Sequence, residues 1–141
     1  MIGYSKVFLD TTPIIYFLDE DVNFGNKVEN ILSEILESRK EMVTSTITCM
    51  EYLTYPYRTD NVEKVDAFFD FVSGCNIAIY SIDMEIAKKA ARIRAEYRYF
   101  KAMDALQLAT ACITGCDLLL TNDKQLRQFE EIKCITVEEL E

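Results

Sequence analysis

Two aspartates directly follow apolar stretches of the chain, and each has a threonine beside it. Asp10 comes after the run VFL and precedes Thr11, and Asp123 comes after the run LLL in the sequence TND. Two further acids, Glu51 and Asp104, stand near the beginnings of predicted helices. Carboxylate oxygens without histidine or thiolate ligands select hard cations such as Mg²⁺ or Mn²⁺. The four acids therefore predict a magnesium or manganese site in which they act as both metal ligands and catalytic residues.

A metal ion held by carboxylates is suited to phosphoryl chemistry. It lowers the pKa of a bound water and offsets negative charge on phosphate oxygens. The chain contains no histidine, so no imidazole can act as the general base. A metal-bound hydroxide can be the nucleophile instead. Neutral oxygens beside the acids would orient the ligands or the water from a second layer. These neutral groups belong to Thr11, Thr121 and Asn122.

Short apolar runs alternate with helical patterns along the chain. The predicted strands are 5–10, 42–45, 76–81, 117–121 and 131–137. The predicted helices are 11–20, 24–40, 47–55, 61–74, 83–98 and 103–115, with a short one at 124–129. This alternation predicts one α/β domain over residues 1–141, with a mainly parallel sheet covered by helices on both faces. In such a sheet, sites form at the carboxyl ends of the strands.

All four acids are predicted to lie at that edge of the sheet. Asp10 and Asp123 stand where strands end, and Glu51 lies in the helix that leaves the second strand. Asp104 stands at the beginning of a helix that must run antiparallel to the strand that follows it. This helix therefore begins at the carboxyl edge, and Asp104 lies there too. Separate segments of the chain thus bring their carboxylates to one place.

Each acid also has a purely structural interpretation. Asp10 can precede a helix capped by Thr12, and Glu51 can complete a capping box with Thr48. Asp104 suits the positive end of its helix dipole, and Asp123 can be the N-cap of the short helix at 124–129. These local roles do not explain why four acids from separate segments should share one edge.

The charge of the chain is uneven. A net charge of −9 argues against a protein that coats nucleic acid without specificity. Residues 88–101, however, hold six lysines and arginines against one glutamate, a local charge of +5. This strip is either a solvated helix face or a surface for phosphates and stacked bases. The aromatic residues within it are Tyr97, Tyr99 and Phe100.

The cysteines and the hydropathy bear on location. Five cysteines, an odd number, with no export signal predict reduced thiols and a cytoplasmic protein. No apolar run approaches the ~20 residues of a membrane helix, so no membrane association is expected. Cys112 and Cys116 are four residues apart, but without histidine or a second close pair we interpret them as core residues rather than zinc ligands.

Taken in order along the chain, these motifs resemble the PIN-domain family of metal-dependent ribonucleases. The resemblance rests on Asp10-Thr11, Glu51, the K-x-x-D-A pattern at 101–105 and TND at 121–123. It implies a three-layer α/β/α sandwich around a parallel five-stranded sheet, and RNA cleavage that depends on Mg²⁺ or Mn²⁺. The compact length is similar to that of VapC-like toxins, which implies an antitoxin partner and a homodimer. The chain lacks the glycine that members often carry shortly after the internal acid.

With RNA as the implied substrate, the basic strip becomes a candidate RNA-binding surface. Its predicted contacts are Arg94, Arg98 and Lys101. A PIN-domain nuclease that processes RNA without being a toxin remains an alternative, as does a non-catalytic binding module on the same fold.

Two other classes of protein fit the sequence less well. A phospho-acceptor receiver domain needs a second acid beside Asp10, where this chain has threonines, and an aspartate at the end of a middle strand. A Ca²⁺ loop over 19–30 would need a glycine where Phe24 stands and a glutamate where Asn30 stands.

Overall fold

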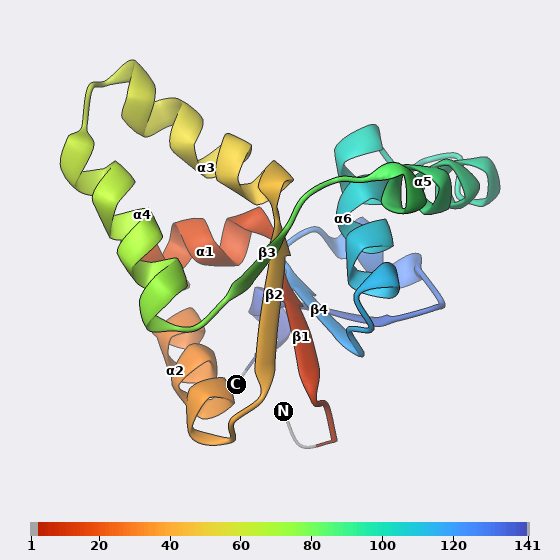
Figure 1. Cartoon of the computed structure of the whole chain (residues 1–141). Coiled ribbons are helices and arrows are strands. Elements are labelled where there is room, and N and C mark those ends of the chain that lie inside the picture. Colours follow the sequence, from red (N-terminus) through yellow and green to blue (C-terminus); the bar gives the residue numbers. More distant parts are fainter. Residues whose placement is uncertain (1–2, 141) are drawn as a thin grey trace.

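A parallel sheet of five strands forms the centre of the molecule (Figure 1). The computed structural model describes residues 3–140. The strands are β1 (Lys6–Leu9), β2 (Glu41–Ser45), β3 (Ala78–Tyr80), β4 (Leu118–Thr121) and β5 (Lys133–Thr136). Their order is β3-β2-β1-β4-β5, and every neighbouring pair is parallel. The predicted parallel sheet is confirmed, and the first strand of the chain lies at its centre.

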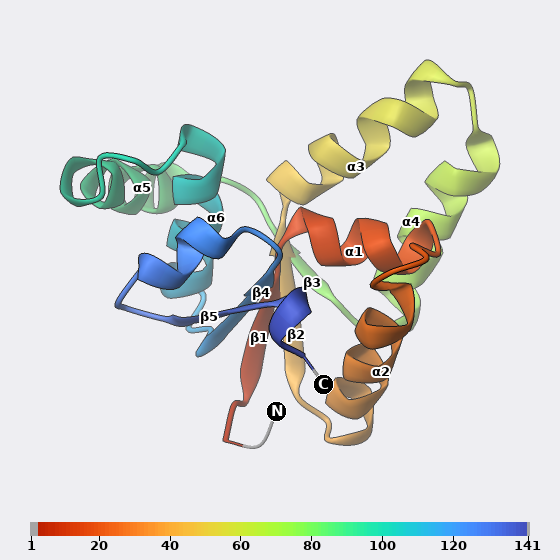
Figure 2. The same ribbon diagram turned by 180° about the vertical axis from the view of Figure 1, so that it is seen from behind.

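Helices cover both faces of the sheet, as Figures 1 and 2 show from opposite sides. The α-helices are α1 (Thr11–Leu18), α2 (Gly25–Glu37), α3 (Thr46–Arg58), α4 (Val62–Gly74), α5 (Met84–Glu96) and α6 (Ala102–Ile113). Two short 3₁₀ helices follow, η1 (Lys124–Gln128) and η2 (Val137–Glu139). Helices α1 to α4 lie on one side of the sheet and α5 and α6 on the other. The predicted three-layer sandwich is confirmed.

The inner positions of β1 and β4 are apolar because both faces of these strands are buried. In β1, Val7 and Leu9 belong to the core cluster under α1 and α2, whereas Phe8 belongs to the cluster under α5 and α6. The leucines of β4 divide in the same way, with Leu119 facing α6 and its two neighbours facing α1. The sheet therefore separates two apolar cores.

Two predicted helix caps are wrong, and in both cases the helix begins nearer to the sheet than predicted. Asp10, not Thr12, is the N-cap of α1, because its backbone is extended and its carboxylate accepts a hydrogen bond from the N–H of Thr11 at 2.9 Å. Ser45, not Thr48, is the N-cap of α3. Each helix starts directly after its strand, so its first turn lies at the sheet edge.

The cysteines lie within residues 3–140 and are all unpaired. Cys116 and Cys134 are buried, and Cys112 packs against the core beneath α5 and α6. Burial raises the pKa of Cys134 to about 12 and, with the charge of Glu131, that of Cys112 to about 11. Both thiols are therefore protonated at neutral pH.

Candidate metal centre

Asp10 stands at the carboxyl end of the central strand and is surrounded by hydrogen-bond donors. Its Oδ1 accepts from the backbone N–H of Thr11 at 2.9 Å and from Nε2 of Gln107 at 3.3 Å. Its Oδ2 accepts from the hydroxyl of Thr121 at 2.7 Å. Burial raises the pKa of Asp10, and the three hydrogen bonds offset part of that rise. A carboxylate at the meeting point of three elements is thus held in one orientation but poorly solvated.

Thr11 connects Glu51 to Asp10 by hydrogen bonds. The hydroxyl of Thr11 donates to Oε1 of Glu51 at 2.6 Å, while the backbone N–H of the same residue donates to Asp10. Glu51 lies on the exposed side of α3, and its charge contributes to the raised pKa of Asp10. The two acids are therefore electrostatic neighbours, although they come from different elements.

Asp104 and Asp123 form the other half of the acidic group. Asp104 lies in the first turn of α6, and its pKa is raised by burial and then by the charges of Asp123 and Asp10. The N–H of Asp123 donates to the hydroxyl of Thr121 at 3.1 Å. Its Oδ1 caps η1 through the N–H of Gln125 at 3.0 Å, so the predicted N-cap is confirmed. Thr121 consequently contacts both strand-end aspartates.

Gln107 is a central residue of this site that the sequence analysis missed. It is buried in α6, and its Nε2 donates to Asp10 and, at 2.9 Å, to the hydroxyl of Thr48. Its Oε1 accepts from the hydroxyl of Ser45 at 2.5 Å. One signal was available in the sequence, because Gln107 is an amide in an otherwise apolar stretch and follows Asp104 by one helical turn.

Asn122 behaves differently from its neighbours in TND. Its Nδ2 donates to the hydroxyl of Tyr16 on α1 at 2.7 Å. Its Oδ1 is buried and has no hydrogen-bond partner within residues 3–140. Whereas the hydroxyls of Thr11 and Thr121 donate to site carboxylates, the side chain of Asn122 ties the loop after β4 to α1.

The donor set of the acidic group fits a hard cation. In the part of the chain that the structure describes, no three acidic, histidine or cysteine side chains stand close enough to form a finished metal cage. The ligands available are nevertheless carboxylate oxygens, which Mg²⁺ and Mn²⁺ prefer. Lys101 lowers the pKa of Asp104, yet the net effect of burial and of the neighbouring acids is a raised pKa. The local negative charge is thus only partly balanced by the protein.

The basic strip directly precedes α6 in the chain, and its last residue, Lys101, acts on Asp104. Arg94 and Arg98 are exposed at the end of α5 and just beyond it, and exposed Lys101 is the N-cap residue of α6, three positions before Asp104. Lys89, by contrast, is paired with Glu131 at 2.5 Å. The three predicted RNA-contacting cations are therefore accessible to solvent.

The predicted stacking role is wrong for two of the three aromatic residues in the strip. Helix α5 ends at Glu96, and the chain folds back so that Tyr97 and Phe100 are buried. Their rings stack on each other at 5.0 Å and pack against Phe129. Only Tyr99, which is 49% exposed, presents a ring to solvent.

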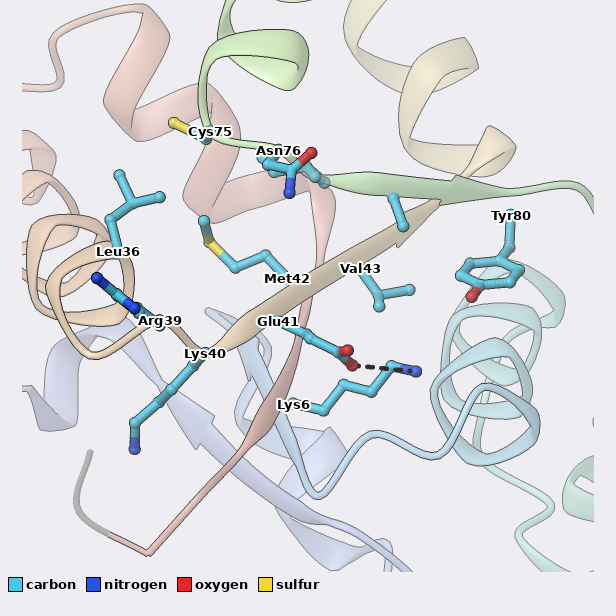
Figure 3. Close-up of a pocket in the computed structure, with 12 residues that line it drawn as sticks. Lys6, Leu36, Arg39, Lys40, Glu41, Met42, Val43, Cys75, Asn76 and Tyr80 are labelled. Carbon is cyan, nitrogen blue, oxygen red and sulfur yellow. Dashed lines mark ion pairs between the residues drawn. The ribbon is translucent and has the colours of Figure 1, made fainter.

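Two hollows lie near opposite ends of the sheet. One measures about 130 Å³ and has Glu51 in its wall. The other measures about 530 Å³ and lies beside the amino ends of β1 and β2, where Lys6 and Glu41 form an ion pair of 3.5 Å (Figure 3). The larger hollow is therefore remote from the acidic group. Over residues 3–140, no helix is both long enough and apolar enough to cross a membrane.

The fold and the acidic group at the carboxyl edge of the sheet define this chain as an α/β protein with a candidate metal centre. Sequence comparison identifies its family. The family model described as PIN domain matches residues 7–132. The chain therefore belongs to the PIN-domain family, as its motifs predict. No curated protein sequence matches the chain.

Solved structures share this fold at low sequence identity. A chain of VapBC2 from Rickettsia felis, solved with a fragment of promoter DNA, is 15% identical with a TM-score of 0.76; 93% of this chain and 98% of that chain are covered. FitAcB from Neisseria gonorrhoeae is 22% identical with a TM-score of 0.74, over 95% and 99% of the two chains. The Sarcin-Ricin loop cleaving toxin VapC20 from Mycobacterium tuberculosis is 16% identical with a TM-score of 0.65, over 90% and 98%.

Proposed function

We propose that this protein is an endoribonuclease dependent on Mg²⁺ or Mn²⁺, and that it is the toxin of a toxin–antitoxin pair. The observation that carries the proposal is the environment of Asp10. This carboxylate is partly buried at the end of the central strand, fixed by three donors, and raises the pKa of Asp104 through its charge. Partly desolvated acids that repel one another and lack a strong counter-charge gain stability from a bound cation.

In the proposed site, Asp10, Glu51, Asp104 and Asp123 hold the metal ion. When bound, the ion supplies a water of lowered pKa and offsets charge on the scissile phosphate. Thr11, Thr121 and Gln107 keep the carboxylates oriented, because each donates a hydrogen bond to one of them. No histidine is needed, which agrees with the composition of the chain.

The proposed substrate is RNA that reaches the acids along the basic strip. A chain of net charge −9 repels polyanions, so a local positive surface is required for binding. Lys101, whose charge acts on Asp104, belongs to such a surface together with the exposed Arg94 and Arg98. Phosphate contacts of this kind position the strand without reading its sequence.

The proposed protein partners are an antitoxin and a second copy of the chain. VapBC and FitAB complexes are among the structures with the same fold. The hairpin of α3 and α4 projects from the sheet and carries exposed apolar side chains, which are typical of interaction surfaces. These side chains are Met50, Tyr55, Tyr57, Val62 and Phe69.

The decisive experiment is RNA cleavage by purified protein with Mg²⁺, Mn²⁺ or EDTA. Wild type is expected to cut in either metal, and Asp10→Asn and Asp104→Asn are expected to lose at least about a hundredfold in rate, the range for removing a group that stabilises charge in the transition state. Asp66→Asn, at an exposed position of α4, is the matched control. Equal activity in all variants would refute the catalytic assignment.

Metal binding can be measured separately from cleavage. Calorimetric titration should detect Mn²⁺ binding to wild type and to Asp66→Asn, and weakened binding to Asp10→Asn. For the toxin proposal, induced expression in bacteria should arrest growth with wild type and not with Asp10→Asn. Growth that is unaffected by the wild-type protein would argue for a PIN-domain nuclease with another role.

A further inference from the structure

A small hollow lies next to the proposed metal centre, between α1, α3 and α4. It measures about 130 Å³, and Glu51 forms part of its wall together with Ile15, Asp19, Tyr55 and Lys64. Sites for whole drug-sized ligands occupy about 300–1,000 Å³. This hollow is therefore large enough for one ring system and too small for a whole nucleotide. Any occupant would lie beside a proposed metal ligand.

Tyr52 holds the carboxylate of the hollow in place. The ring of Tyr52 is buried and stacks on Phe68 at 5.1 Å, with 16° between the planes. Its hydroxyl donates to Oδ1 of Asp19 at 3.1 Å. Burial and the charge of Asp19 raise the pKa of Tyr52 to about 12, so the hydroxyl remains a donor at neutral pH.

An ammonium group and a carboxylate stand side by side at the mouth of the hollow. Nζ of Lys64 lies 3.1 Å from Oδ1 of Asp19, the same oxygen that accepts from Tyr52. Their side chains are 40% and 38% exposed, so both keep a face that a ligand can reach. The pair offers an acceptor and a donor at a fixed separation.

We propose that this hollow binds a guanine base that flanks the scissile phosphate, an inference that rests on the proposed ribonuclease function. The Watson–Crick edge of guanine presents two adjacent N–H donors next to the O6 acceptor. The carboxylate of Asp19 accepts from the two donors, and the ammonium group of Lys64 donates to O6, a common partner of lysine. Adenine, cytosine and uracil do not present two adjacent donors on this edge, so each of them leaves part of the pair unused.

Tyr55 supplies a face for the same base. It follows Glu51 by one turn of α3, and its side chain is 65% exposed. Bases splayed out of single-stranded RNA stack on exposed aromatic rings of this kind. Glu51 and Tyr55 thus lie along one side of α3, with the metal centre at one end and the hollow at the other.

The test is the base preference of cleavage. Wild-type protein with Mn²⁺ is given an RNA library randomised around one position, and the cut ends are sequenced. We expect guanine to be enriched next to the cut, and this preference to fall about tenfold in Lys64→Ala and in Asp19→Asn, as for the loss of a paired base contact. Lys6→Ala is the matched control, because it also removes a lysine paired with an acid at the rim of a hollow, but at the other end of the sheet (Figure 3).

A binding measurement separates this inference from the nuclease proposal. Short oligoribonucleotides with one central guanine or adenine are titrated in EDTA, and wild type should favour guanine where Lys64→Ala does not. If wild type cuts RNA but the variants retain its base preference in both assays, the guanine site is refuted and the nuclease stands. If binding shows the preference and no cleavage occurs, the guanine site stands and the nuclease proposal is refuted. If Lys64→Ala leaves RNA cleavage and RNA binding unchanged but weakens binding of a protein partner, the hollow takes a protein side chain. That result would overturn the proposal.

Discussion

The amide of Gln107 donates a hydrogen bond to the carboxylate of Asp10, with 3.3 Å between Nε2 and Oδ1. The same nitrogen donates to Thr48 on α3 at 2.9 Å, and the amide oxygen accepts from Ser45 at the end of β2. One buried side chain of α6 thereby connects the ends of β1 and β2 with the first turn of α3. The orientation of Asp10 depends on this connection.

Gln107→Leu is expected to destabilise the protein by about 1–3 kcal/mol, because it removes one hydrogen-bond partner from each of Asp10, Thr48 and Ser45 inside a largely buried network. Urea unfolding measures the change. Gln128→Leu, at an exposed position of η1, is the control and should alter stability by less than about 0.5 kcal/mol. Equal midpoints for the two variants would show that the amide network contributes no net stability.

Asp104→Asn is expected to stabilise the metal-free protein at neutral pH. The pKa of Asp104 is raised above 3.8, so the folded state holds its proton more tightly than the unfolded state. Its stabilising contribution is complete below 3.8 and is lost as pH rises through the raised value. The advantage of the variant should therefore appear above pH 3.8 and stay constant once the folded-state pKa has been passed. Thermal unfolding in EDTA from pH 3.5 to pH 8, a range chosen around the ordinary carboxyl pKa, measures it.

Asp117→Asn provides a control of opposite sign. Partial burial raises the pKa of Asp117, but the hydrogen bonds from Lys6 and Ser5 together lower it by more, so the net shift is downward. This carboxylate stabilises the fold above pH 3.8, and its contribution is lost as pH falls through the depressed pKa. The variant should be less stable than wild type at neutral pH. The same direction of change in both variants would contradict the assignment.

Divalent metal is expected to raise the unfolding temperature of the wild-type protein. A ligand at a hundred times its dissociation constant stabilises a protein by about 2.7 kcal/mol. Asp10→Asn should respond little, because it removes a proposed ligand, and EDTA should abolish the wild-type response. Differential scanning calorimetry over a series of Mg²⁺ and Mn²⁺ concentrations measures the effect. An equal response in Asp10→Asn would place the binding elsewhere.

Reversing the charge at Arg94 and Arg98 is expected to weaken RNA binding and to flatten its salt dependence. Each phosphate contact with a single strand contributes about 0.7 to the slope of log affinity against log salt concentration. The double variant to glutamate should therefore lose up to about 1.4 from that slope, measured by fluorescence anisotropy. Arg39→Glu, beside the hollow of Figure 3, is the control. An unchanged slope would return the strip to a solvated face or a protein contact.

The positions of the strand-end acids were predictable because parallel strands must end at a common edge. Asp10 and Asp123 could be placed there from the apolar runs before them, without any knowledge of strand order. The helix caps were not predictable in the same way. Several threonines follow β1 and β2, and a threonine at the start of a helix can cap it or lie inside its first turn, which depends on the residue where the strand ends.

Gln107 and the aromatic residues of the basic strip show a second limit. Glutamine in an apolar helix carries no indication of its partners, which come from β1, β2 and α3. Tyr97 and Phe100 stand between cations in the sequence, but the chain turns after Glu96 and carries both rings into the core. Local charge therefore predicted the surface, and tertiary packing decided which rings reach it.

The two apolar cores on either side of the sheet make the acidic group a sensor of local unfolding. Glu51 is attached to the layer of α3, whereas Asp104 belongs to the layer of α6. A fluctuation that lifts one layer from the sheet would part these carboxylates while the other core stays intact. Assembly of the acidic group therefore requires both layers to be packed on the sheet at the same time.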